Sequence, residues 1–167
     1  MKRILIFILG FSGFLFAYNN DKTIKIKKTP ESPVLDGVID PCWSKADSAV
    51  SFFQLSPYYA KKPTQKTIAR ILTTKKSLFC LMVCYNNQGQ VQAYKGTLDN
   101  ISGDNCSLML DTFGNSRTAY KFAVSASGVR SDCRLVDDAR NRDYSWDGIW
   151  FAESKVYDWG YVVEMEI

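Results

Sequence analysis

Most of the chain alternates between apolar and polar residues with a period of two, which is the pattern of a β-strand that buries one face. Turn-forming residues separate these stretches, and residues 77–85 are apolar on both faces, so we expect that strand in the middle of a sheet. The expected strands cover residues 23–28, 67–73, 77–85, 105–111, 119–125, 129–136, 148–156 and 160–167. This succession predicts an all-β fold, an antiparallel β-sandwich of jelly-roll or immunoglobulin-like type.

One short helix interrupts the pattern, in the sequence Pro-Val-Leu-Asp-Gly-Val-Ile-Asp-Pro-Cys-Trp. Asp36 and Gly37 form a turn dipeptide in which glycine accepts a positive φ. Asp40 stands where a helix N-cap belongs, and Pro41 occupies the first helical position, where a missing N–H costs nothing. The sequence therefore predicts a helix after Asp40, with Trp43 closing one end of the β core.

The first residues have the order of an export signal. Two basic residues precede an apolar run over residues 4–16, and Ala17 ends that run before a polar stretch. The run of about 13 residues is too short to cross a bilayer as a helix, which takes about 20. We expect a signal peptide over residues 1–17, a mature domain over 18–167, and a location in the periplasm, the outer membrane or the extracellular space. An uncleaved anchor is the alternative.

The last residues continue a strand pattern without a turn or a polar tail after it. An apolar residue at the end of an unpaired strand leaves an edge that invites association. We therefore expect the sandwich to be truncated at its C-terminal end and covalently continuous with a downstream domain.

The residue inventory excludes several kinds of chemistry. The chain has no histidine, which excludes a Ser-His-Asp triad and a His-ligated zinc or haem within these residues. Its formal net charge is +4, and the lysine clusters do not interleave with aromatic residues, so we expect no nucleic-acid partner. Nothing singles out a pair of carboxylates with the spacing of a glycosidase. We predict no catalytic residue and no organic cofactor.

The cysteines do not form a recognisable framework. There are five of them, an odd number with irregular spacing, which indicates neither a complete disulfide set nor a zinc site. Cys80 and Cys84 share one face of a predicted strand about 13 Å apart, too far for a bridge between them. We interpret the cysteines as small buried hydrophobic residues.

Three aromatic residues are candidates for contact with a ligand. Trp146 and Trp150 are four residues apart in a strand-like stretch, with Tyr144 in the same register. They either seal the core of the sandwich or form a platform on which sugar rings stack. Of the three, Tyr144 is expected to be the most exposed.

Charged residues supply the other candidates. Asp137, Asp138 and Asp143 concentrate carboxylates in one loop, which makes calcium possible. The spacing is not that of an EF-hand, and neighbouring arginines favour a solvated loop with Arg–Asp pairs. Arg117 follows a turn and would bind either a carboxylate of the domain or an acidic ligand.

Several motifs, in order, resemble one known family. The helix motif around Trp43, the strand Asp-Asn-Cys-Ser-Leu-Met-Leu-Asp at 104–111, and the segments at 111–122, 128–132 and 146–150 look like carbohydrate-binding module family 9. They are most similar to the family-9-like domain at the N-terminus of large secreted bacterial proteins that continue into an outer-membrane barrel-like region. The likeness covers about residues 24–167 and also marks Asp104, which precedes the central strand, as a candidate ligand residue.

The resemblance implies where a sugar clamp would lie. In sugar-binding members two tryptophans hold a sugar ring, and a Glu and an Arg on neighbouring strands bond its hydroxyls. The first tryptophan position looks like Ile101 or Ser102, the Glu position like Ser107 and the Arg position like Ala123. The second tryptophan would lie beyond Ile167.

We therefore expect a non-catalytic carbohydrate-binding domain of an exported or envelope protein. Its partner would be a polysaccharide or oligosaccharide of the xylan or cellulose type. The domain would then serve as an accessory to a hydrolase, and the full-length parent could carry O-glycosyl hydrolase activity. The alternative is a docking or assembly domain for an outer-membrane β-barrel that no longer binds sugar.

Overall fold

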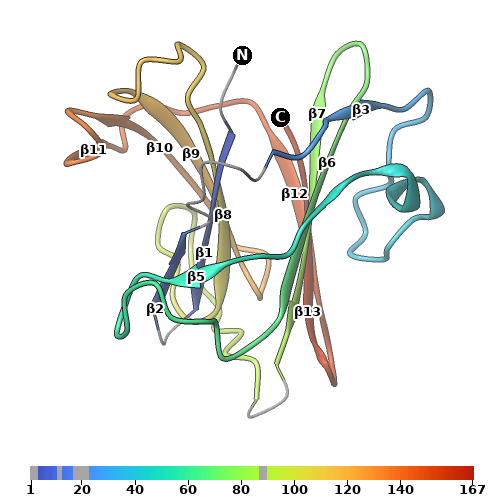
Figure 1. Cartoon of the computed structure of the whole chain (residues 1–167), viewed down its shortest axis with the longest axis horizontal. Coiled ribbons are helices and arrows are strands. Elements are labelled where there is room, and N and C mark those ends of the chain that lie inside the picture. Colours follow the sequence, from blue (N-terminus) through green and yellow to red (C-terminus); the bar gives the residue numbers. More distant parts are fainter. Residues whose placement is uncertain (1–3, 11–12, 17–22, 87–89) are drawn as a thin grey trace.

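Two β-sheets face each other in the computed structural model of the chain (Figure 1). The structure describes residues 23–86 and 90–167 together with the backbone of 4–10 and 13–16. Every strand pair is antiparallel except the short pair of β3 with β6. The predicted β-sandwich is confirmed.

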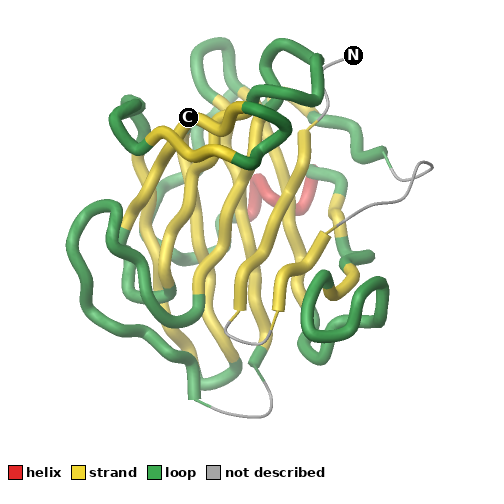
Figure 2. The backbone as a smooth tube through the Cα atoms, turned by 90° about the vertical axis from the view of Figure 1, so that its left-hand side faces the viewer, coloured by secondary structure: helices red, strands yellow, loops and turns green. Residues whose placement is uncertain are grey.

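The first sheet has seven strands in the order β11-β10-β9-β8-β1-β2-β5. Figure 2 shows this sheet from outside, with the long loop before β8 at one edge of the strands. Its strands are β1 (Ile4–Gly10), β2 (Gly13–Phe16), β5 (Phe53–Gln54), β8 (Asn105–Leu110), β9 (Ala119–Ser125), β10 (Arg130–Val136) and β11 (Asn141–Asp143).

The second sheet has six strands, and β7 lies between β13 and β6, as its two apolar faces predict. The main path runs β12-β13-β7-β6-β3, and β4 pairs with β6. The strands are β3 (Lys27–Lys28), β4 (Ser48–Ala49), β6 (Thr67–Thr73), β7 (Leu78–Tyr85), β12 (Phe151–Tyr157) and β13 (Gly160–Glu166).

The main core lies between the sheets. Residues of β6, β7 and β13 pack there against residues of β8 and β9, among them Met82, Leu108 and Phe122. Because alternate residues of a strand point to opposite faces, the remaining apolar residues of β7 point away from this core. A second cluster on the outer face of the six-stranded sheet buries Leu72, Phe79, Leu81, Val83, Val162 and Trp43.

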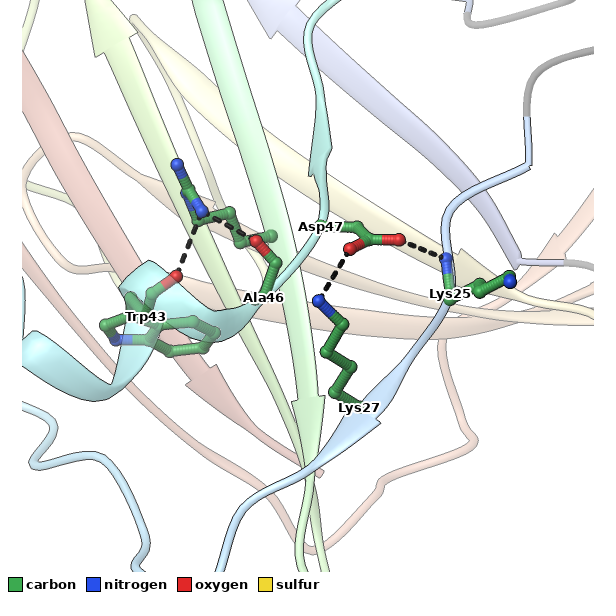
Figure 3. A network of polar contacts seen from close by, with 6 residues as sticks. Lys25, Lys27, Trp43, Ala46 and Asp47 are labelled. Carbon is green, nitrogen blue, oxygen red and sulfur yellow. Dashed lines mark hydrogen bonds and ion pairs between the residues drawn. The ribbon is translucent and has the colours of Figure 1, made fainter.

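Trp43 therefore covers the outside of a sheet and does not close one end of the core, which corrects the prediction. It belongs to η1 (Pro41–Lys45), a 3₁₀-helix where a short helix was predicted. Asp40 makes no side-chain cap; its carboxylate accepts the backbone N–H of Val34 at 2.7 Å. The guanidinium of Arg70 on β6 donates to the carbonyls of Trp43 and Ala46, at 3.0 and 2.7 Å (Figure 3).

An ion pair and a hydrogen bond connect Lys25 and Lys27 to Asp47, which follows η1. Lys27 lies 3.0 Å from one carboxylate oxygen of Asp47, and the other oxygen accepts the backbone N–H of Lys25 at 3.0 Å (Figure 3). The strand predicted over residues 23–28 is nevertheless reduced to the two exposed residues of β3. Only the end of β6 is available there for pairing, and Ile26 is 39% exposed.

Glu164 holds the whole helix motif in place from β13. Its side chain is fully buried; one oxygen accepts the backbone N–H groups of Asp36 and Gly37 at 3.2 and 3.0 Å, and the other accepts the indole N–H of Trp43 at 3.1 Å. Burial raises the pKa of this carboxyl, against the opposing effect of the three donors. The most distinctive motif of the sequence is therefore a structural lock.

Replacing Gly37 with alanine should weaken this lock. Gly37 has φ of 71°, and a Cβ there would lie 2.4 Å from the Cβ of Lys155. We expect a loss of about 1–3 kcal/mol in the free energy of unfolding, measured by urea denaturation. Gly114→Ala is the matched control, because Gly114 has φ of 66° with nothing within 4 Å of an added Cβ. Equal losses in both variants would contradict a role for the close approach.

The apolar run at the N-terminus forms β1 and β2, which pair with each other and insert between β8 and β5. The predicted cleavage site at Ala17 lies outside the described residues, so the signal peptide remains a prediction. Within the described part of the chain, no helix has the length and apolar character needed to cross a membrane.

The end of the chain is paired on both sides, contrary to the sequence-based expectation. β13 lies between β12 and β7, and the backbone of Ile167 exchanges hydrogen bonds with Leu78 at 2.7 and 2.9 Å. An exposed strand edge is therefore not found at this position. The downstream domain expected from the sequence is not tested by this pairing and stays a prediction.

Candidate functional site

The two candidate tryptophans close the edge of the core beside β9. Phe122 meets the rings of Trp146 and Trp150 edge to face, with centroids 5.9 and 5.2 Å apart, and Tyr120 lies 4.5 Å from Trp146. Trp150 is 4% exposed, so its ring offers no free face to a sugar. Residues 144–150 are irregular and do not form the strand that was predicted to align them.

Polar contacts hold Trp150 in this position. Asp132 is buried; its carboxylate accepts the indole N–H of Trp150 at 3.1 Å and the backbone N–H of Gly148 at 2.8 Å. The guanidinium of Arg130 donates to the carbonyl of Trp150 at 2.6 Å and lies 5.6 Å from the centre of its ring. Of the two alternatives for these tryptophans, the core role fits Trp150.

Tyr144 and Asp104 have different surroundings. Tyr144 follows β11 directly and is 50% exposed, as expected for the outermost of the three aromatic residues. Asp104 accepts the backbone N–H of Gln92 at 3.0 Å and donates its own backbone N–H to the carbonyl of Gln92 at 2.9 Å. The side chain of Asp104 therefore anchors the long loop before β8. Of these two residues, Tyr144 has the side chain that is more available to a ligand.

A polar hollow of about 620 Å³ lies at the end of β9, β10 and β11. It opens between the turn that precedes β9 and the turn that joins β10 to β11. It brings Arg117 together with Asp137 and Asp138, which the sequence analysis proposed in a separate group. The lining consists of Asn115, Arg117, Thr118, Val136, Asp137, Asp138, Arg140 and Asn141.

The first wall of the hollow is a turn built around two side chains. Asp111 accepts the backbone N–H groups of Gly114 and Ser116 at 2.6 and 2.8 Å, and such donors lower the pKa of its carboxyl. The side-chain oxygen of Asn115 accepts the N–H groups of Arg117 and Thr118 at 2.8 and 3.0 Å. The turn is therefore shaped by its own residues and needs no ligand to form.

The second wall has an unusual backbone. Asp137, Asp138 and Ala139 are consecutive residues with φ of 55°, 60° and 64°, a left-handed conformation that non-glycine residues adopt at a cost. The N–H of Asp138 donates to the carbonyl of Arg117 at 3.2 Å, which ties the two walls together. Costly backbone conformations of this kind cluster at binding sites.

The charged groups in the hollow are exposed to solvent and form no ion pair among the described residues. Among the described residues, the ion pairs are Lys27 with Asp47 and Arg134 with Asp143, both outside the hollow lining. Arg117, Arg140 and Asp138 thus have no ion partner within 4.0 Å in this part of the chain. The hollow offers two guanidinium groups, a carboxylate and amides to a polar molecule.

The carboxylates considered for calcium do not converge. Asp137 accepts the side-chain N–H of Asn141 at 2.7 Å. Asp143 accepts the hydroxyl of Ser145 and pairs with Arg134 at 2.8 Å, and these contacts lower its pKa. Across the described residues, no group of three or more His, Cys, Asp or Glu side chains is arranged to hold a metal ion.

Comparison with known proteins identifies the fold. No protein-family model and no curated protein matches the sequence. Solved structures do match, among them a carbohydrate binding module of family 9 from Caldicellulosiruptor kristjanssonii in complex with glucose, at a TM-score of 0.59, and one in complex with cellotriose, at 0.55. Both are 17% identical to this chain and are matched over 85% of it, and over 67% and 66% of their own length. The chain has a family-9-like fold.

The sugar-clamp positions implied by the resemblance are not available in this family-9-like domain. Ser107 on β8 and Ala123 on β9 stand opposite each other and are 0% and 3% exposed. Neither side chain can reach a sugar as it lies. Ser102 is exposed and Ile101 is half-buried in the loop before β8, and neither supplies an aromatic face.

Five residues that line the hollow of the family-9-like domain were not proposed as ligand residues from the sequence: Asn115, Thr118, Val136, Arg140 and Asn141. The sequence did contain one indication of this site. Two turns rich in amide and charged side chains lie directly before β9 and directly after β10, and turns at the same edge of a sheet lie close together in space. Sequence alone did not show that these two turns share an edge.

Proposed function

We propose that this family-9-like domain binds a saccharide in the polar hollow at the end of β9–β11 without catalysing a reaction. The observation that carries the proposal is the hollow itself, which combines unpaired Arg117, Arg140 and Asp138 with two amides. Its volume falls within the range of about 300–1,000 Å³ usual for ligand sites. The fold supports the proposal, because the family 9 module from C. kristjanssonii that shares it was solved with glucose and with cellotriose.

The chemistry of the lining suits vicinal hydroxyl groups. A sugar hydroxyl both donates and accepts, so it pairs well with an arginine that donates and an aspartate that accepts. Arg117 and Arg140 supply the donors, Asp138 supplies the acceptor, and Asn115 and Asn141 can do either. The positions of these donors and acceptors would decide which arrangement of sugar hydroxyl groups the hollow prefers.

None of the residues that line the hollow is aromatic, which limits the expected affinity. Tyr144 lies outside the lining, beyond the end of β11 opposite Asn141; it is the candidate for stacking, and one exposed ring contributes about 1 kcal/mol. A site with one such ring and a few exposed hydrogen bonds should bind with a Kd of about 1 mM. We infer xylan- or cellulose-type oligosaccharides as ligands and an exported accessory role beside a hydrolase, in keeping with the sequence-based expectation.

Titration calorimetry with xylo- and cello-oligosaccharides tests the proposal. We expect Arg117→Ala to weaken binding at least about tenfold, because it removes a charge-assisted donor, and Tyr144→Ala to weaken it about fivefold through loss of stacking. Tyr59→Ala is the matched control, since Tyr59 is 74% exposed in the loop after β5, at the opposite edge of the seven-stranded sheet from β11, and it should bind like the unaltered chain.

Two outcomes would overturn the proposal. One is the absence of heat at about 10 mM sugar, roughly ten times the expected Kd. The other is binding that Arg117→Ala leaves unchanged. Either would favour the docking or assembly role, which the burial of Ser107 and Ala123 already supports.

A further inference from the structure

Two cysteines on facing sheets lie within reach of each other. The Sγ atoms of Cys84, on β7, and Cys106, on β8, are 3.2 Å apart. Both side chains are buried, at 5% and 0% exposure, in the core between the sheets. We propose that Cys84 and Cys106 form a disulfide that joins the two sheets of the sandwich.

The distance favours a bond over a chance contact. A disulfide has an S–S length of about 2.05 Å, so the two sulfurs have about 1 Å to close, which small side-chain rotations supply. The strands are already fixed by pairing on both sides, β7 with β13 and β6, and β8 with β9 and β1. The two sulfurs are therefore held close together by strands that are fixed on both sides.

The other cysteines are poorer partners. Cys80 shares a strand face with Cys84 four residues away, which is too far for a bridge between them. Cys42 packs against the cluster on the outer face of the six-stranded sheet, and Cys133 is not part of the core between the sheets. Cys84 and Cys106 are therefore the specific pair.

Formation of the bond needs an external disulfide as oxidant, such as oxidised glutathione or the cystine of an exported oxidoreductase. One cysteine thiolate attacks that disulfide and releases one thiol of the oxidant. The second thiolate then attacks the mixed disulfide and releases the other thiol. The two cysteines lose two protons and two electrons, and the oxidant is reduced to two thiols.

The bond must form before the core closes. Burial raises the pKa of the Cys106 thiol well above its usual value, and burial raises that of the neighbouring Cys80 to about 12. Thiolate, the reactive species, is therefore scarce in the folded core. Oxidation is therefore expected during folding, while both thiols are still solvated, in an oxidising compartment outside the cytoplasm.

The test compares full-length protein refolded in a glutathione redox buffer with protein refolded in reductant. After oxidative refolding, titration in denaturant should find three free thiols of the five cysteines, and peptide mapping should find Cys84 linked to Cys106. A disulfide that closes a loop of this size restricts the unfolded chain, so the reduced form should melt roughly 6–12 °C lower.

Single variants make the result specific. Cys84→Ala and Cys106→Ala should each abolish the difference in Tm between oxidised and reduced samples. Cys80→Ala, the matched control from the same strand and the same core, should keep that difference. Five free thiols after oxidative refolding, a bridge that uses another cysteine, or a redox-dependent Tm that survives Cys106→Ala would each overturn the proposal.

Discussion

Replacing Glu164 with alanine is expected to lower the free energy of unfolding by about 3–5 kcal/mol, enough to unfold a large fraction of a marginally stable domain. The change leaves the N–H groups of Asp36, Gly37 and Trp43 buried without their acceptor. Trp43 then loses its fixed position over the outer face of the six-stranded sheet. Urea denaturation followed by tryptophan fluorescence measures the loss.

Two variants serve as comparisons. Glu164→Gln keeps the volume but offers one acceptor oxygen for three donors, so its loss should fall between zero and that of alanine. Glu153→Ala is the matched control, because Glu153 lies directly opposite Glu164 on β12 but is exposed, and it should stay within about 0.5 kcal/mol of the unaltered chain. A loss below about 1 kcal/mol for Glu164→Ala, roughly the value of one ordinary hydrogen bond, would contradict the lock.

The same carboxyl should make stability depend on pH. Burial raises the pKa of Glu164 in the folded state, so the folded chain holds this proton more tightly than the unfolded chain. Its contribution to stability is full below the unfolded pKa and is lost as the pH rises through the raised folded pKa. The unaltered chain should therefore lose stability relative to Glu164→Gln, which carries no titratable group at this position, as the pH rises through the raised folded pKa.

A chain that begins at Tyr18 should self-associate, whereas residues 1–167 should remain monomeric. Removing the first 17 residues takes β1 away from β8 along its whole length and β2 away from β5. The exposed backbone of β8 then becomes an edge that accepts a strand from another molecule. Size-exclusion chromatography with light scattering should show dimers or larger species for the shorter chain.

A lysine introduced on β8 tests whether the exposed edge of this strand causes the association. Met109→Lys on β8 should restore the monomer of the shorter chain, since lysine on an edge strand opposes strand addition. A shorter chain that stays monomeric with an unchanged Tm would contradict a supporting role for β1. If the leader is removed during export, the same reasoning requires another strand to cover β8 in the mature protein.

Much of the fold follows from the sequence because alternation is a direct signature of a half-buried strand. The limits of β6 and β9 agree with the predicted ones residue for residue. β11 was missed because it is three residues long and its burial pattern is largely exposed. The strand predicted over 23–28 failed for a related reason: its alternation is real, but most of the segment has no neighbouring strand to pair with.

Less of the candidate site could be predicted. Arg117, Asp137 and Asp138 were each noticed, yet their meeting in one hollow depends on three successive left-handed residues that no composition rule indicates. The pair Cys84 and Cys106 was missed because spacing along the chain says nothing about distances between facing sheets. From the sequence, the position of Trp150 was compatible with both a core role and a sugar platform. Its indole N–H bond to Asp132 became visible only in the structure.

The contact between Gly37 and Glu164 spans 127 residues of sequence, and this span orders events during synthesis. The N-terminal partner emerges first and then waits for the other; at about 5–20 residues per second the delay is roughly 6–25 s. Throughout that time the donors of Asp36, Gly37 and Trp43 are solvated, and the outer face of the six-stranded sheet is uncovered. The nascent chain thus cannot close this lock until residue 164 has been synthesised.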